Sequence, residues 1–215
     1  QAVSRGLGDV YKRQDNTSIS CETIDYGPCA FMDSYEANKV FSSIDQYGRY
    51  AFSNQSRVAP WNLSRLAETI LFLISKNTSD AIKVVEKILF DFDKNFNASL
   101  DILSSRKLGF KNYSKKTSSL YSELLNLMEA GKADFTGTFK SLKATLIKED
   151  DSIFSNNFRN SDEENLHAVS QWLGNWRKLL QENSKSKTEA IELLSSSNPE
   201  SVSYTHLTLP TTIEV

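Results

Sequence analysis

Apolar residues recur at intervals of three and four through most of this chain after residue 59, which is the pattern of amphipathic helices. Pro60 suits the first turn of one helix, and Ser79 is the candidate cap of a second. The apolar positions are Trp61, Leu66, Ile70 and Ile74 in the first helix and Ile82, Val85, Leu89, Phe92 and Phe96 in the second. Stripes of this width predict helices packed on a core.

Four further helices follow from the same spacing. The third stops near Gly131, the fourth is capped by Asp134, and a short sixth helix runs from Lys187 to Leu194, before Pro199. The inward positions are Leu120, Leu124 and Leu127 in the third, Phe135, Phe139, Leu142 and Leu146 in the fourth, and Leu166, Val169, Leu173, Trp176 and Leu180 in the fifth. The stretches 110–116 and 148–160 are predicted to be polar connectors.

Residues 16–59 differ from this helical body. They contain Gly27, Pro28 and Gly48 as turn signals, and aromatic side chains are scattered between them. A long loop rich in aromatic residues is typical of a packed, functional segment. We therefore predict a mainly α protein that carries one unusual loop region.

Composition narrows the function classes. The formal net charge is −2, with 39% hydrophobic and 24% charged residues, and no basic stripe with interleaved aromatics predicts nucleic-acid binding. No apolar run reaches the length of a membrane helix, so we expect no membrane partner. Cys21 and Cys29 are the only cysteines, which is consistent with a reducing, cytoplasmic location. They are either small structural residues or a regulatory thiol pair, and the sequence leaves both open.

The two ends do not continue this pattern. Residues 1–14 and 202–215 resemble translated sequencing-adapter sequence, and we leave both out of the functional interpretation. The remaining chain divides into 15–59, a loop region, and 60–201, the helical region.

The loop region contains one pair of residues with a spacing typical of a nucleotide site. Asp25 follows Asn16 by nine positions and opens an Asp-Tyr-Gly turn. In kinase-type phosphotransferases, an Asn and the Asp of an Asp-Phe-Gly turn bind Mg²⁺ from the two strands of a short hairpin. Ile19 can lie on the first strand and Ile24 on the second. Their hard oxygen atoms suit Mg²⁺, although Asn and Asp also begin many purely structural turns.

The surrounding sequence closely resembles the selenoprotein-O-type family of pseudokinase-like protein adenylyltransferases. The matching residues are Asp15, Asn16, Ile24 to Pro28, Phe31, Asp33, Asp45, Gly48 to Tyr50, Phe52, Asn54, Gln55, Trp61 to Leu63, Arg65 and Leu66, followed by Asp134 to Thr136, Trp172, Leu173, Trp176, Arg177, Asn198 and Pro199. The resemblance covers residues 15–199, and its first half is the more specific.

The resemblance implies a kinase-like fold in which reversed ATP donates AMP to Ser, Thr or Tyr hydroxyls of protein substrates. By the same resemblance, Asn16 and Asp25 bind ATP and Mg or Mn, and Asp15 helps to activate the attacking hydroxyl. The fold class expected is mainly α: a partial protein-kinase-like C-lobe with a short β-hairpin around the Asp-Tyr-Gly turn, then a C-terminal helical region. Residues 15–59 would be the metal-binding loop and activation-segment-like region.

Other residues receive structural roles or remain open. Asp33 and Asp45 are predicted to cap or brace the loop, and Arg49 and Arg65 either bind phosphate or anchor it. No glycine-rich cover, strand Lys or paired Glu precedes Asp15, so we expect the chain alone to be inactive. Two alternatives remain: a helical binding or scaffold module without catalysis, and ordinary kinase-type phosphoryl transfer.

Overall fold

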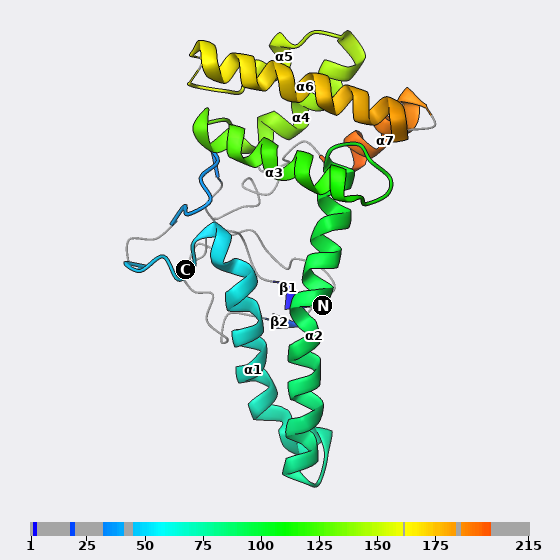
Figure 1. Cartoon of the computed structure of the whole chain (residues 1–215). Coiled ribbons are helices and arrows are strands. Elements are labelled where there is room, and N and C mark those ends of the chain that lie inside the picture. The colour runs from blue at the N-terminus through cyan, green and yellow to red at the C-terminus, as the bar shows by residue number, and fades with distance from the viewer. Residues whose placement is uncertain are drawn as a thin grey trace, which may run out of the picture. The chain divides into compact units, whose positions relative to one another are not determined.

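A computed structural model of the chain describes residues 2–3, 18–19, 32–40, 45–160, 162–183 and 186–198. Over these ranges the protein is mainly helical, as predicted (Figure 1). The described residues form two compact units: unit 1 contains 2–3, 18–19, 37–40 and 45–98, and unit 2 contains 32–36 and the described residues from 99 to 198. None of the helices in these ranges is both long and apolar enough to cross a membrane.

Unit 1 consists of a small ladder and a helical hairpin. Strands β1 (Ala2–Val3) and β2 (Ser18–Ile19) pair in antiparallel fashion, with Ala2 opposite Ile19. A 3-10 helix (Phe52–Asn54) leads directly into α1 (Gln55–Ile74). Helix α2 (Thr78–Lys107) then runs back antiparallel to α1, and its residues up to Ala98 belong to this unit (Figure 1).

Helix α1 begins earlier than predicted. It starts at Gln55, so Pro60 lies inside the helix and not in its first turn. Proline has no N–H, and therefore Pro60 cannot donate to the carbonyl of Ser56. The residues before it are compatible with a helix, and Val58 is buried with 7% of its surface exposed. Packing of this first turn therefore outweighs the boundary signal that the proline gives.

Helix α2 also departs from the prediction at both ends. It begins at Thr78, and the side chain of Asn77 accepts a hydrogen bond from the Ser79 N–H at 3.0 Å, so Ser79 is not the cap. The helix continues past Phe96 to Lys107. Its predicted apolar stripe is only partly covered, because Ile82 and Phe96 are 41% and 37% exposed.

The end of α2 is set by glycine geometry. Gly109 has φ +84°, a left-handed conformation that favours glycine, and the N–H of Phe110 donates to the Ser105 carbonyl at 3.0 Å. The indole Nε1–H of Trp176 donates to the Leu108 carbonyl at 2.9 Å. A carbonyl at the helix end thus has a partner in the core of unit 2.

Unit 2 is built from five helices and the end of α2. They are α3 (Lys115–Ala130), α4 (Phe135–Lys148), α5 (Ser152–Ser155), α6 (Glu163–Asn183) and α7 (Lys187–Ser197). The predicted cap of α4 is confirmed, because the Asp134 carboxylate accepts a hydrogen bond from the Gly137 N–H. The predicted stop at Gly131 is confirmed as well, since Gly131 is the C-cap of α3. Helix α6 packs on α3, while α4 contacts α5 and α7 (Figure 1).

Stacked aromatic rings form the centre of this unit. Trp172 stacks on Trp176 at 6.1 Å between ring centroids and on Phe154 at 5.5 Å. Phe154 and Phe158 are almost completely buried. The prediction of a polar connector over 148–160 was therefore wrong: two phenylalanines four positions apart anchor α5 in the core, although Asp, Ser and Asn dominate the local composition.

Two glycines of unit 2 give opposite predictions for substitution by alanine. A Cβ at Gly131 would lie 2.5 Å from the Phe158 ring and 3.1 Å from the Leu127 carbonyl, whereas a Cβ at Gly174 would meet no atom within 4 Å. We expect Gly131→Ala to lower the free energy of unfolding by about 1–3 kcal/mol through overpacking. Gly174→Ala, inside α6, should raise it by about 0.5–1 kcal/mol. Urea unfolding followed by circular dichroism measures both, and equal effects would contradict this packing.

Candidate active site

The residues predicted to carry the chemistry lie outside the described part of the chain. These are Asp15, Asn16 and Asp25, together with Cys21 and Cys29. The nearest described element is β2, which contains Ile19 and starts two positions after Asn16. Its described partner is β1, while the second strand expected around Ile24 also lies outside the described residues. The catalytic and metal-binding assignments therefore stay predictions.

The first described residues after the Asp-Tyr-Gly turn belong to unit 2. The Tyr35 N–H donates to the Ala133 carbonyl at 2.9 Å, and the Phe135 N–H donates to the Asp33 carbonyl at 2.8 Å. Ser34 forms a bridge with Asp134, between α3 and α4. Tyr35 is buried, with 5% of its surface exposed. The segment 32–36 is thus fixed to this junction, and Asp33 takes part through its main chain while its carboxylate stays exposed.

Aromatic rings complete this attachment. Tyr35 stacks on Phe135 at 5.7 Å, Phe135 meets Phe139 edge-on at 5.5 Å, and Tyr121 stacks on Phe139 at 6.0 Å. Burial raises the pKa of Tyr35, and the charge of Glu129 adds to this effect. Burial also raises the pKa of Tyr121 to about 12, with a smaller contribution from Tyr35. Both phenols therefore stay protonated near neutral pH and act as structural groups.

The high pKa of Tyr121 predicts a specific dependence of stability on pH. An unfolded tyrosine ionises near pH 10, so between about pH 10 and 12 the unfolded chain loses a proton that the folded chain keeps. The stabilisation present below pH 10 is lost as the pH rises through this range, by about 3 kcal/mol. Tyr121→Phe should remove this loss, and Tyr113→Phe, at a 45% exposed position, should not. Parallel stability curves for the wild type and Tyr121→Phe would contradict it.

A second anchored turn lies in unit 1, just before α1. The Asp45 carboxylate accepts hydrogen bonds from the N–H groups of Arg49 at 2.9 Å and Tyr50 at 2.8 Å. Gly48 has φ +63°, and its carbonyl accepts from the Asn54 amide at 2.8 Å. The prediction that Asp45 braces this loop is confirmed. The carboxylate is engaged by the main chain and is a weak candidate for metal binding.

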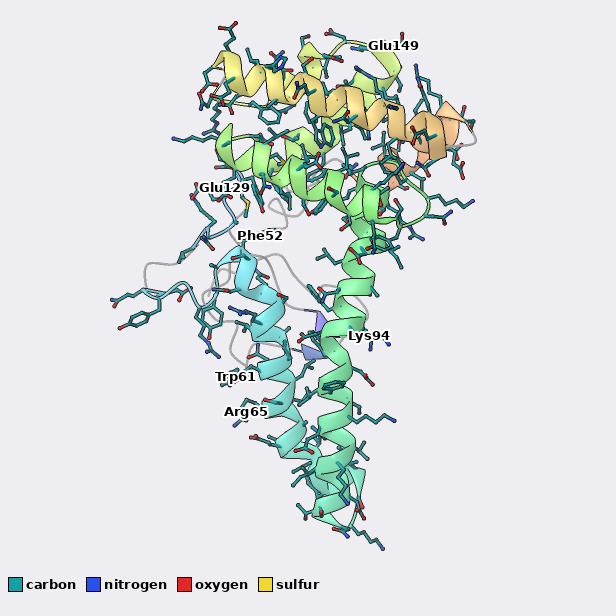
Figure 2. The ribbon with its side chains drawn as sticks, in the orientation of Figure 1. Phe52, Trp61, Arg65, Lys94, Glu129 and Glu149 are labelled. Atoms are coloured by element: carbon teal, nitrogen blue, oxygen red, sulfur yellow. The ribbon has the colours of Figure 1, made fainter. Side chains whose placement is uncertain are left out.

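Arg49 and Arg65 meet at one tryptophan. The guanidinium carbon of Arg49 lies 4.5 Å from the centroid of the Trp61 ring, and that of Arg65 lies 5.8 Å from it. Arg65 also pairs with Glu68 at 2.6 Å. Trp61 and Arg65 project from the same side of α1 (Figure 2). Sequence reasoning missed this cluster, although the i, i+4 spacing of Trp61 and Arg65 was a usable signal.

The described residues offer no alternative to the predicted metal ligands. Within the described ranges, no group of three or more His, Cys, Asp or Glu side chains is arranged to hold a metal. The donor set of Asn16 and Asp25, one amide and one carboxylate oxygen, fits the preference of Mg²⁺ for hard ligands. Two protein ligands also leave positions for water and phosphate oxygens.

Comparison with known proteins identifies the family. A sequence profile described as "Protein adenylyltransferase SelO" matches residues 7–211. The chain belongs to the SelO protein adenylyltransferase family. Residues of both the loop region and the helical units fall within the matched range, in agreement with the resemblance seen in the sequence. The SelO family is a family of transferases, because its description names an enzyme that adenylylates proteins.

Curated SelO relatives have the same kind of name. The chain is 42% identical over 185 residues to "Protein nucleotidyltransferase YdiU" of Pelagibacter ubique, covering 86% of this chain and 36% of the relative. It is 41% identical over 192 residues to the protein of that name from Clostridium botulinum, covering 89% and 37%. For Nitrosococcus oceani the identity is 39% over 185 residues, covering 86% and 35%. The chain therefore spans little more than a third of the length of these relatives.

Proposed function

We propose that this chain is the metal-binding and C-terminal helical part of a protein adenylyltransferase that transfers AMP from ATP to Ser, Thr or Tyr hydroxyls. The match of the SelO profile to residues 7–211 carries this proposal. It includes a partial kinase-like C-lobe, with a hairpin around the Asp-Tyr-Gly turn. We also propose a cytoplasmic location, because two cysteines are too few for the disulfide framework of a secreted protein.

Each predicted residue has a role in this reaction. Asn16 and Asp25 would hold Mg²⁺ or Mn²⁺, and the ion would neutralise charge on the phosphate oxygens of ATP. Asp15 accepts the proton of the acceptor hydroxyl while the oxygen of that hydroxyl forms a bond to the α-phosphorus. The bond between the α-phosphorus and the bridging oxygen breaks, and pyrophosphate leaves with that electron pair. Most of the rate enhancement comes from positioning and charge stabilisation.

The described structure supports an activation-segment-like role for the residues after Asp25. Residues 32–36 are attached to unit 2, and residues 45–54 form the braced turn of unit 1. A substrate-contacting loop gains from such attachment because less conformational entropy is lost on binding. The attachment of residues 32–36 uses main-chain hydrogen bonds and the buried ring of Tyr35, and the Asp45 carboxylate braces the turn before α1.

We further propose that these 215 residues alone do not transfer AMP. A kinase-like site also needs a glycine-rich cover, a strand Lys and a paired Glu. We assign these groups to the part of the relatives that this chain does not cover, which is almost two thirds of the length of the Pelagibacter ubique protein. The isolated chain should therefore incorporate no label from ATP into protein.

A chimera tests the proposed function. The 185-residue matching region of the Pelagibacter ubique protein is replaced by the corresponding residues of this chain, and the purified chimera is incubated with bacterial lysate proteins. ATP labelled at the α- or γ-phosphate is supplied separately. Label from the α position supports adenylylation, and label from the γ position alone indicates ordinary phosphoryl transfer. If the parent labels protein and the folded chimera does not, the scaffold alternative is favoured.

A further inference from the structure

Three arginines and one tryptophan gather on one exposed face of unit 1. Arg57, Trp61 and Arg65 follow one another at intervals of four residues, so they form a stripe along α1. All three side chains are exposed, Trp61 to 42%. Arg49 reaches the same ring from the preceding turn. Figure 2 shows Trp61 and Arg65 pointing outward on the side of α1 away from α2. We call these four residues the arginine stripe.

The positive charge of the arginine stripe is mostly uncompensated. Within the described part of the chain, the Arg49 guanidinium contacts only the rings of Tyr50 and Trp61, and that of Arg57 makes no hydrogen bond or ion pair. Only Arg65 has a carboxylate partner, Glu68. Between residues 45 and 65 there are three arginines and one aspartate, a net charge of +2. That aspartate, Asp45, is already bound to main-chain N–H groups.

The N–H groups of the Arg49 guanidinium carry no hydrogen bond or ion pair within the described residues. The guanidinium carbon lies 4.5 Å from the Trp61 ring centroid, a cation–π distance that leaves the N–H groups able to donate to a ligand. This planar fork matches a carboxylate, which it binds through two parallel hydrogen bonds. The turn that carries Arg49 is fixed by Asp45 and by the Asn54 bond to the Gly48 carbonyl. The contact with Trp61 therefore positions the exposed guanidinium of Arg49 without using its N–H donors.

The dimensions of the stripe match an extended acidic peptide. Arg57 lies four residues before Trp61 on α1, which corresponds to about 6 Å along the helix axis, and Arg49 lies over the Trp61 ring. Carboxylates two residues apart in an extended chain are separated by about 7 Å. Stacking of a nucleic-acid base would be limited to the part of the Trp61 ring that Arg49 leaves open.

We propose that the arginine stripe binds an acidic segment of a partner protein, with Arg49 and Arg57 pairing with Asp or Glu carboxylates beside the Trp61 ring. This inference rests on the proposed function, because it takes the partner to be the protein that receives AMP. Binding itself needs neither ATP nor turnover. A failure to bind and a failure to transfer AMP are therefore separate results.

Binding is measured with the 215-residue chain and a fluorescently labelled decapeptide of alternating Glu and Ala. Fluorescence anisotropy gives the affinity. Trp61 emission gives a second readout, because Trp172 and Trp176 are only 2% and 0% exposed. We expect Arg49→Gln and Arg57→Gln each to weaken binding roughly five- to tenfold, as expected for loss of a charge-assisted pair. Arg49→Lys should also weaken it, because lysine keeps the charge but lacks the fork.

The matched control is Arg159→Gln, which removes the same charge from an exposed residue of unit 2 and should leave the affinity unchanged. An unchanged affinity in the Arg49→Gln, Arg57→Gln double variant would overturn the proposal, as would an equal loss in the control. Tighter binding of tripolyphosphate or of oligo-dT than of the acidic peptide would overturn it too. Within the described residues Arg57 makes no hydrogen bond or ion pair and is exposed, so its variant decides the outcome if Arg49→Gln disturbs the turn.

Discussion

Replacing Asp25 with Ala should abolish AMP transfer by the chimera, with a loss of at least about a thousandfold in kcat. Asp25 is predicted to supply the anionic oxygen that holds the metal ion against the ATP phosphates. Its loss leaves the phosphate charge without compensation during attack on the α-phosphorus. Asn16→Ala should have an effect of the same kind. Transfer of α-label to protein, followed at saturating ATP and Mg²⁺, measures both.

Asp33→Ala provides the matched control, because Asp33 lies eight positions further along the same loop and braces it through its main-chain carbonyl. Its exposed carboxylate makes no hydrogen bond in the described part of the chain, and activity should stay within about twofold of the parent chimera. Full activity in Asp25→Ala would remove the metal-binding assignment. Equal losses in Asp25→Ala and Asp33→Ala would mean that the loop is sensitive to any change.

Trp176→Ala should lower the free energy of unfolding of the chain by about 3–5 kcal/mol. The Trp176 side chain is fully buried, stacks on Trp172 and donates to the Leu108 carbonyl. Truncation opens a large cavity and leaves a helix-end carbonyl without its donor. Urea unfolding followed by far-UV circular dichroism measures the change.

Two further variants separate the causes. Trp176→Phe keeps much of the apolar volume but loses the N–H, so it should cost about 1–3 kcal/mol. Trp61→Ala, at a 42% exposed position, should cost less than about 1 kcal/mol. If Trp176→Ala changed stability no more than Trp61→Ala does, the central position of Trp176 in unit 2 would be wrong.

Periodicity predicted the helices well where the apolar residues were spaced regularly. The stripes of α3 and α4 and the end signals at Asp134 and Gly131 correspond to the structure, and so does the α6 stripe except for Leu166, which is 40% exposed. Helix boundaries were less predictable where two signals competed. Proline normally lies in the first turn of a helix, but α1 begins five residues before Pro60, and Val58 in that first part is buried. Helix α5 was not predicted, because only two aromatic side chains in a polar stretch indicate that this region is buried.

The candidate site was predictable only through family resemblance. Asp15, Asn16 and Asp25 form a short pattern that also occurs in ordinary turns, and the SelO profile supplies the context that this pattern lacks. Contacts between distant positions could not be predicted from spacing. Arg49 meets Trp61 twelve positions later because a braced turn folds back onto α1, and a helical repeat contains no information about such a turn.

The attachment of residues 32–36 to unit 2 has a consequence for the order of folding. Ser34 pairs with Asp134, about 100 positions away, whereas the contacts of α3 with α6 and of α4 with α5 and α7 all lie within residues 115–197 and so close shorter loops. Contacts that close such a long loop carry a large entropic cost, so they form after the local helical packing. The segment that follows the candidate metal ligands should therefore become ordered last. A chain whose helical core is not yet folded would then lack an ordered segment after the candidate metal ligands.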